Sequence, residues 1–139
     1  YLNKISGPLL DRIDLQIEIV PVPFEEISKT APGEPSAAIR ERVIAARKIQ
    51  EERFKNEKGI YCNAQMTPKL IAKYAVLDET SLAMLKTAMT RFDLSARAYD
   101  RILKVARTIA DLDKSENIQF QHIAEAIGYR NLDRAAWGE

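Results

Sequence analysis

Residues that most often carry chemistry are scarce in this chain of 139 residues. The single cysteine, Cys62, cannot form an internal disulfide, which fits a reducing cytoplasm, and we interpret it as a small buried or half-buried apolar side chain. The single histidine, His122, has no acid or nucleophile at a spacing typical of catalysis. Because the Cys/His clusters of zinc sites are also absent, the sequence predicts no metal site.

Long apolar runs and a large excess of one charge sign are absent too. No segment is long and apolar enough to cross a membrane, and the first residues do not have the pattern of a secretion signal. We therefore expect a cytoplasmic protein without a membrane partner. The formal net charge of +1 gives no argument from bulk electrostatics for strong nucleic-acid binding. With 46% hydrophobic and 29% charged residues, the composition is that of one modest globular domain.

Glycine is scarce, and this limits what the chain can bind. None of the five glycines belongs to a GxxxxGK(S/T) phosphate loop, whose backbone N–H groups would hold the phosphates of a nucleotide. No apolar run ends in the paired acids that hold Mg²⁺ in a Walker B strand. We therefore expect the chain alone to hold no cofactor and not to hydrolyse ATP.

Most of the chain has the spacing of amphipathic helices. The expected helices run from Ser36 to about Lys55, from Thr67 to about Tyr74, from Asp78 or Thr80 to about Phe92, from Ser95 to about Leu112, and from Gln119 to Ile127. The side chains expected to face inward are Ile39, Val43, Ala46, Ile49, Phe54, Leu82, Leu85, Met89, Tyr99, Ile102, Leu103, Ala106, Ile109, Ala110, Phe120, Ile123, Ala124 and Ile127. Gly128 is expected to end the last helix. We also expect a short helical turn over residues 130–137, with Trp137 packed on the bundle or partly exposed.

The segment over residues 7–15 reads GPLLDRIDL and joins a short helix to an apolar alternating run. A proline suits the first helical turn, because its missing N–H would be unpaired there anyway. The alternating run has the period-two pattern of a strand, which we predict over residues 15–20. Arg12 lies where the helix gives way to the strand. Its planar guanidinium can bind phosphate oxygens through two N–H groups, or it can pair on the surface with Asp11 or Asp14.

The helix capped by Ser95 begins SARAYDRILK and carries basic residues opposite its apolar face. Arg97, Arg101 and Lys104 form a stripe on that face, and Arg107 lies to one side of it. A solvated helix face explains Arg101, Lys104 and Arg107, to which the sequence assigns no further role. For Arg97, in the first turn, a contact with phosphate is the alternative to that solvated face.

The two segments resemble motifs of the AAA+ ATPases of the magnesium chelatase and MCM helicase clade. The first is similar to the arginine-finger segment, where the arginine matching Arg12 reaches the γ-phosphate of ATP in the neighbouring protomer. The second is similar to the sensor-2 helix, where the arginine matching Arg97 contacts bound ATP from the lid domain. The stretches YLNKISGP over residues 1–8 and HIAEAIGYRNLDR over residues 122–134 resemble the magnesium chelatase-like ComM/YifB group of bacteria. The resemblance covers nearly the whole chain.

This resemblance implies a mostly α fold: the helical lid domain of an AAA+ protein, preceded by a short helix–strand remnant of its core. Residues 1–28 would be the end of the AAA+ core, residues 29–36 a linker with two prolines and a glycine, and residues 37–139 the lid with its sensor-2 helix. Without the rest of their sheet the first residues would lack partners, so we expect them to be loosely held. We expect Tyr1 to lie within a longer protein, because the first motif begins almost at once.

The parent protein that the resemblance implies is a hexameric, ATP-driven helicase that promotes branch migration during natural transformation. It would use ATP and Mg²⁺, and its partners would be the N-terminal AAA+ core of the same chain, neighbouring ring subunits and DNA. Two alternatives stay open: a magnesium chelatase motor subunit that drives Mg²⁺ into protoporphyrin, and a helical adaptor that binds protein or DNA through the basic stripe. A phosphate loop upstream of this chain would exclude the adaptor.

Overall fold

The computed structural model describes residues 4–29 and 31–130. Its elements are α1 (Gly7–Asp11), α2 (Phe24–Ser28), α3 (Ser36–Phe54), the 3-10 turn η2 (Asn63–Gln65), α4 (Pro68–Tyr74), α5 (Glu79–Arg91), α6 (Ala96–Leu112) and α7 (Phe120–Gly128). No strand occurs within these described ranges. The expectation of a mostly helical fold is therefore confirmed.

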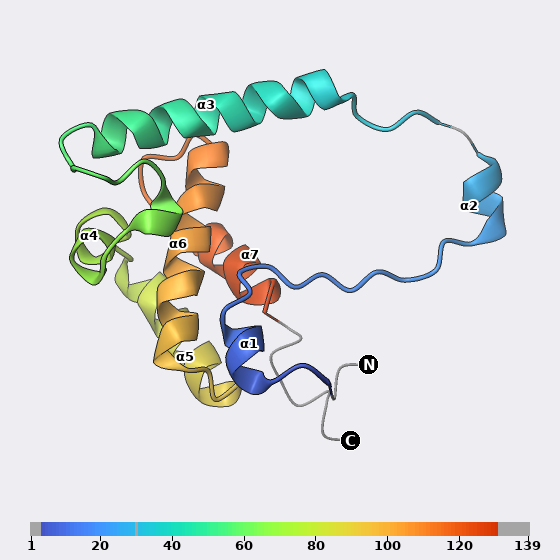
Figure 1. Ribbon diagram of the computed structural model, residues 1–139. Helices are drawn as coiled ribbons and strands as arrows, with labels where there is room; N and C mark the ends of the chain where they lie inside the picture. Colours follow the sequence, from blue (N-terminus) through green and yellow to red (C-terminus); the bar gives the residue numbers. More distant parts are fainter. Residues whose placement is uncertain (1–3, 30, 131–139) are drawn as a thin grey trace.

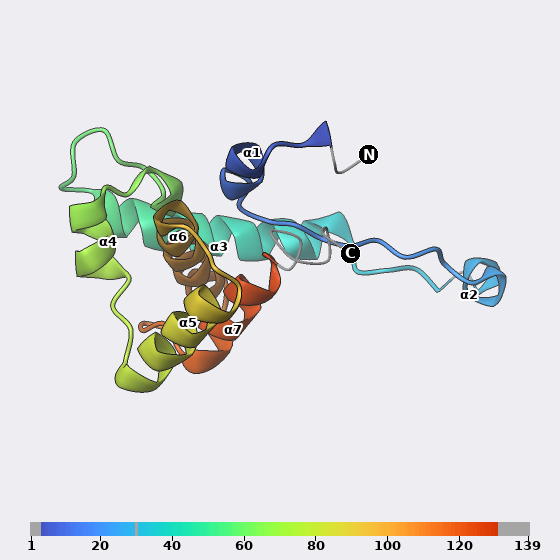
Figure 2. The same ribbon diagram turned by 90° about the horizontal axis from the view of Figure 1, so that it is seen from below.

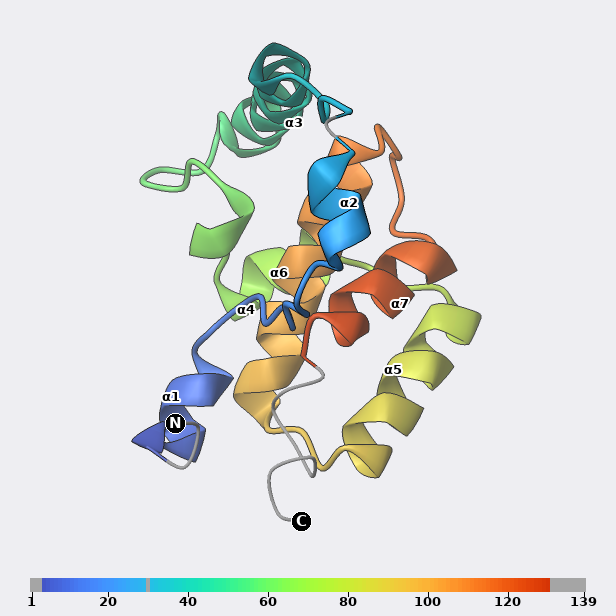
Figure 3. The same cartoon turned by 90° about the vertical axis from the view of Figure 1, so that its right-hand side faces the viewer.

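Helix α6 runs through the centre of the bundle (Figure 1). It contacts α7, α3, α4 and η2, and α5 packs in turn along α7 (Figure 3). The side chains of Ala98, Ile102, Ala106 and Ala110 lie one turn apart on α6, and all are 0% exposed. Alanines at this spacing let the neighbouring helices approach closely, while Ile102 supplies the larger apolar surface. Burial of one such isoleucine side chain stabilises the fold by about 1.5–3 kcal/mol.

Side-chain caps determine where three of the helices begin. Thr67 caps α4 through a bond from the Leu70 N–H at 3.4 Å, Asp78 caps α5 through a bond from the Ser81 N–H at 2.7 Å, and Ser95 caps α6 through a bond from the Ala98 N–H at 3.1 Å. Each cap satisfies one of the N–H groups that a helix start leaves without an intrahelical partner. These caps confirm the helix starts expected at Thr67 and Ser95. Of the two starts expected for α5, Asp78 and Thr80, the structure has Asp78.

Some side chains expected to face inward are instead exposed. They are Ile39, Leu82, Tyr99 and Phe120, with exposed fractions between 36% and 48%, and Ala124. The first four lie in the first turns of α3, α5, α6 and α7. An amphipathic pattern gives the face of a helix but not how far a neighbouring helix extends along it, so first turns that project past their neighbours stay in solvent.

The strand predicted over residues 15–20 is wrong. These residues have no regular element, and the side chain of Gln16 is buried, whereas those of Ile17 and Ile19 are 65% and 88% exposed. The Gln16 N–H donates to the carbonyl of Tyr129 at 2.8 Å, so this position is tied to the end of α7. A strand needs a ladder with a neighbour, and the described residues contain no second strand to provide it.

Residues 17–28 form a segment that we call the apolar arm. It leaves the bundle, carries α2 at its far end, and is connected back to the bundle at α3 (Figures 1 and 2). Its large apolar side chains are exposed: Ile17, Ile19, Val20, Val22, Phe24 and Ile27. Lys29 and residues 31–35 of the expected linker have no helix or strand. The expected turn over residues 130–137, Trp137 included, lies outside the described residues after position 130.

Candidate functional site

Arg97 lies in the first turn of α6, and its side chain is exposed. Among the described residues it makes no hydrogen bond or ion pair. The first turn of α6 contains no acidic residue. A helix N-terminus carries a partial positive charge, which disfavours a cation and favours an anion. The positive charge of Arg97 and the partial positive charge of the helix start therefore both favour the binding of an anionic ligand.

Arg12 is the C-cap residue of α1 and is also exposed. One terminal nitrogen of its guanidinium donates to the carbonyl of Pro8 at 3.1 Å, so the side chain folds back over the last turn of its own helix. It pairs with neither Asp11 nor Asp14 in the structure. Asp14 instead pairs with Arg101, at 2.7 Å between Nη1 and Oδ1.

The pair between Asp14 and Arg101 brings the two sequence motifs together. Arg101 lies one helical turn after Arg97 on α6, and Asp14 lies two residues after Arg12. Helix α1 accordingly lies beside the N-terminal half of α6 (Figures 1 and 3). Both arginines singled out by the sequence therefore belong to one end of one packed body.

The segment around Arg12 is also attached to the end of α7, which sequence reasoning did not foresee. Arg130 is only 3% exposed and donates through Nη1 to the carbonyl of Ile13 at 2.9 Å and through Nη2 to that of Asp11 at 3.3 Å. The side-chain amide of Gln16 donates to the carbonyl of Leu10 at 3.3 Å. Arg130 ends the GYR part of the HIAEAIGYRNLDR stretch over residues 122–134, but that stretch carries no local signal of a contact more than a hundred residues away.

The expectation that Arg107 lies beside a solvated face is wrong. Its side chain is buried, donates to the carbonyls of Ser115 at 2.9 Å and Glu116 at 3.0 Å, and lies 3.2 Å from a carboxylate oxygen of Asp111. Burial lowers the pKa of Arg107, and the nearby carboxylate of Asp111 opposes that shift. Arg107 thus holds the loop after α6 and is not available on the surface. Lys104 donates to the carbonyl of Ala64 at 3.1 Å.

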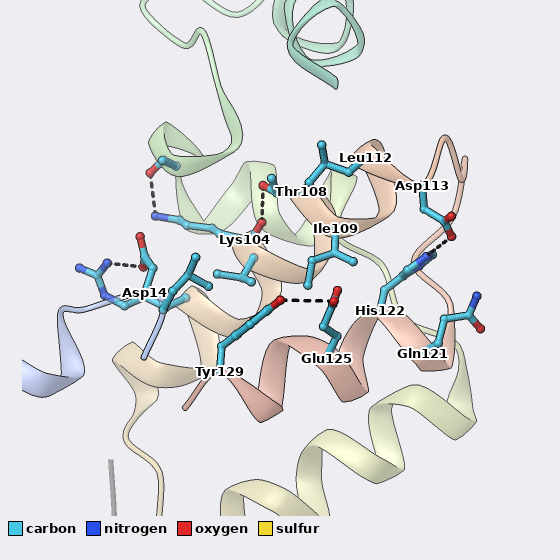
Figure 4. Close-up of a pocket in the computed structure, with 14 residues that line it drawn as sticks. Asp14, Lys104, Thr108, Ile109, Leu112, Asp113, Gln121, His122, Glu125 and Tyr129 are labelled. Atoms are coloured by element: carbon cyan, nitrogen blue, oxygen red, sulfur yellow. Dashed lines mark hydrogen bonds and ion pairs between the residues drawn. The ribbon is translucent and has the colours of Figure 1, made fainter. Parts of the chain in front are cut away.

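A groove of about 940 Å³ lies between α6, α7 and the segment after α1. Figure 4 shows the side chains that line it. Leu15, Val105, Ile109 and Leu112 supply apolar surface, and charged groups of both signs surround them. At its α7 side the charge of Glu125 raises the pKa of Tyr129. A groove of mixed charge has no evident preference for a charged small molecule.

The lone histidine is buried and hydrogen-bonded within the fold, and the lone cysteine is half-buried as expected. His122 is 2% exposed; its Nδ1 accepts the Gln119 N–H at 2.9 Å, so its Nε2 is the donor to Asp113 at 2.8 Å. Cys62 is half-buried with a free thiol. In residues 4–29 and 31–130, no group of three or more His, Cys, Asp or Glu side chains could hold a metal ion. No helix there is long and apolar enough to span a membrane.

Two family models match the chain. Residues 33–130 match the model described as "Magnesium chelatase, subunit ChlI C-terminal", and residues 1–27 match "Magnesium chelatase, subunit ChlI". The first match covers α3 to α7 and contains Arg97. The second contains α1 and Arg12.

Curated relatives match over almost the whole chain. The uncharacterized protein YifB of Escherichia coli K12 and the competence protein ComM of Haemophilus influenzae are each 44% identical over 135 residues, which is 96% of this chain and 26% of each relative. An uncharacterized protein of Mycobacterium tuberculosis H37Rv is 34% identical over 130 residues, which is 94% of this chain and 25% of that relative. The chain therefore spans about a quarter of the length of these relatives. The expected resemblance to the ComM/YifB group is confirmed.

Proposed function

The chain belongs to the family of the magnesium chelatase subunit ChlI C-terminal region, and on that premise we propose that it is the lid part of an AAA+ ATPase. In this proposal the phosphate loop and the Mg²⁺-binding acids lie in the part of the full-length protein that this chain does not include. The lid closes over the bound ATP and assists its binding and hydrolysis.

The observation that carries this proposal is the unpaired guanidinium of Arg97 on the first turn of the capped helix α6. A buried or paired arginine would have a structural explanation, as Arg107 has, but Arg97 has none among the described residues. We propose that Arg97 contacts the phosphates of ATP bound by the core of the same chain. A fixed cation there stabilises the charge on the transferring phosphoryl group.

We propose that Arg12 acts in trans on ATP held by the neighbouring subunit of a ring, with a hexamer as the expected assembly. Its exposure supports this role, because a finger must extend beyond its own subunit. Only one hydrogen bond, to the carbonyl of Pro8, would have to be exchanged for phosphate oxygens. Such an exchange replaces a neutral acceptor with a charged one, which strengthens the bond.

The division of the chain into residues 1–28, 29–36 and 37–139 remains part of the proposal. The two family matches end at residue 27 and begin at residue 33, inside or next to the expected linker. The apolar arm supports the proposal of a longer protein, because it exposes several large apolar side chains that a folded protein would normally cover. We propose that the rest of the AAA+ core covers this arm in the full-length protein.

For the full-length protein we propose a ring helicase that acts in DNA processing, with ATP and Mg²⁺ as cofactors. Support comes from the Haemophilus influenzae relative, which is named a competence protein. A chelatase motor is the alternative, and the two are separated by whether DNA or a porphyrin-binding partner stimulates ATP turnover.

The test is the Arg97→Ala substitution in the full-length protein, with Arg47→Ala on the exposed face of α3 as the matched control. We expect Arg97→Ala to lower ATP turnover by roughly 10²-fold, the scale of losing one preorganised charge-stabilising donor. The melting temperature should stay unchanged, since Arg97 is exposed and makes no hydrogen bond or ion pair among the described residues. If turnover per folded molecule equals that of Arg47→Ala, Arg97 is not a sensor of ATP.

A further inference from the structure

We propose that Arg130 is a positioning residue that fixes the segment carrying Arg12, so that the finger can reach the neighbouring nucleotide. This inference rests on the finger role proposed for Arg12. The proposed function gives no role to the GYR residues at the end of α7, and this inference assigns one to Arg130.

Helix α1 needs such support because it has only five residues. A helix this short is not stable by itself in water, and the carbonyls of its last turn have no intrahelical partners. Each of these carbonyls finds a partner here: Pro8 accepts from the Arg12 side chain, Leu9 and Leu10 accept the N–H groups of Arg12 and Ile13, and Asp11 accepts from the Arg130 side chain. The Arg130 bond is the one that comes from another part of the fold.

The geometry of the Arg130 contact is specific to the backbone on both sides of Arg12. One terminal nitrogen binds the carbonyl of Asp11 and the other binds that of Ile13, which are the residues directly before and after Arg12. Two fixed carbonyls restrict the rotation of the backbone between them. The guanidinium of Arg130, which follows α7, therefore sets the direction in which the Arg12 side chain leaves the backbone.

Arg130 is itself held firmly enough to act as an anchor. Its backbone N–H donates to the carbonyl of Ile127 at 3.0 Å, and the preceding carbonyl, of Tyr129, accepts the Gln16 N–H at 2.8 Å. Its side chain is 3% exposed, so its charge must be satisfied by the protein. The pair between Asp14 and Arg101 adds a second link, but its side chains are 48% and 31% exposed and such pairs contribute little.

A lysine cannot reproduce this contact, because it is a single point of charge without the planar fork that spans two acceptors. Loss of the fork would let Arg12 shift relative to the neighbouring nucleotide. A displacement of about 1 Å from a distant change can lower turnover by roughly 10²-fold. Since a finger in trans does not build the nucleotide site of its own subunit, the KM for ATP should change much less than kcat.

The experiment compares Arg130→Lys and Arg130→Gln with Arg107→Lys in the full-length protein. Arg107 is the matched control, because it too is a buried arginine that donates to carbonyls, but those carbonyls lie at the end of α4 and after α6. We expect kcat for ATP to fall by about 10–100-fold in the Arg130 variants, with KM within about twofold of the unchanged protein. The same substitutions made on top of Arg12→Ala should cause no further loss.

Hydrogen exchange of the backbone amides over residues 9–16 gives a readout that does not depend on catalysis. Exchange there should become faster in the Arg130 variants and stay unchanged in Arg107→Lys. If exchange is unchanged, the anchor is refuted even where Arg12 proves to be a finger. If exchange accelerates but Arg12→Ala leaves turnover intact, the anchor stands and the finger role fails.

Two further outcomes would overturn the proposal that Arg130 positions Arg12. In the first, Arg130→Lys lowers turnover by the same factor in the unchanged protein and in the Arg12→Ala variant, which would show that Arg130 acts by another route. If both Arg130 variants fail to fold while Arg107→Lys folds, Arg130 is required for the core and is not a positioning residue.

Discussion

Asp111 is the residue whose loss should disturb the helical bundle most, because three side chains with little exposure depend on it. Its side chain is 0% exposed. Arg53 on α3 binds it with both terminal nitrogens, at 2.6 and 2.8 Å, and Arg107 lies 3.2 Å away. The Asn63 amide donates to it at 2.8 Å. This carboxylate thereby joins α3, η2 and the C-terminal half of α6.

The Asp111→Ala substitution would leave two guanidinium groups and an amide without their common acceptor. The side chain of Arg53 is 11% exposed and that of Arg107 is 5% exposed, so water can replace little of what is lost. Removing one partner of a buried charge pair costs about 3–5 kcal/mol. Against a total unfolding free energy of about 5–15 kcal/mol, this is a large fraction. For a domain of this size the melting temperature should fall by roughly 10–20 °C.

Urea denaturation and thermal melting of the chain measure this effect, with Glu34→Ala as the control. Glu34 pairs with Arg42 by the same kind of bidentate contact, but both side chains are about half exposed. We expect the control to leave both midpoints unchanged, because exposed pairs are screened by water. If Asp111→Ala shifted the midpoints no more than Glu34→Ala, the buried network would not hold α3 to α6.

Further predictions concern nucleotide binding, pH and capping. Calorimetric titration of the chain with a slowly hydrolysed ATP analogue and Mg²⁺ should show weak or no binding, because the sequence contains no phosphate loop; a micromolar Kd would place the nucleotide site within it. The hydrogen bond from the Ser81 N–H lowers the pKa of Asp78 from its ordinary 3.8, so its stabilising effect is present above that value and is lost as pH falls through the lower, folded-state pKa. Asp78→Asn keeps a capping group but does not titrate, and should therefore weaken the acid dependence of the unfolding midpoint below pH 3.8; an unchanged acid profile would contradict this. Ser95→Ala should lower the unfolding free energy by about 1 kcal/mol through loss of the α6 cap, and equal urea midpoints would show that this cap does not contribute.

The helices of the bundle could be predicted because their signals are local. Thr67, Asp78 and Ser95 cap the helices that were expected to start there, and the small and branched apolar residues of α6 form its buried face. The strand over residues 15–20 was wrong for a reason outside the segment. Its alternating pattern is genuine, but a strand exists only beside another strand, and the described residues offer none.

The candidate site was predictable in part. The positions of Arg12 and Arg97 followed from their motifs, and the structure leaves both exposed. The burial of Arg107 and Arg130 could not be predicted, because each depends on carbonyls that only the folded chain brings close. A basic residue on a helix gives no local sign of whether its charge meets solvent or a buried acceptor.

The central claim is that Arg12 completes the nucleotide site of a neighbouring subunit, and mixing two inactive forms of the full-length protein tests it most directly. One form carries Arg12→Ala, which should keep nucleotide binding but lose roughly 10³-fold or more in turnover. The other lacks the phosphate-loop lysine that the proposal places in the AAA+ core. Mixed rings contain interfaces where an intact finger meets an intact loop, so the account predicts that part of the ATP turnover returns on mixing. If mixed rings form, as native mass spectrometry would show, and no turnover returns, Arg12 does not act in trans.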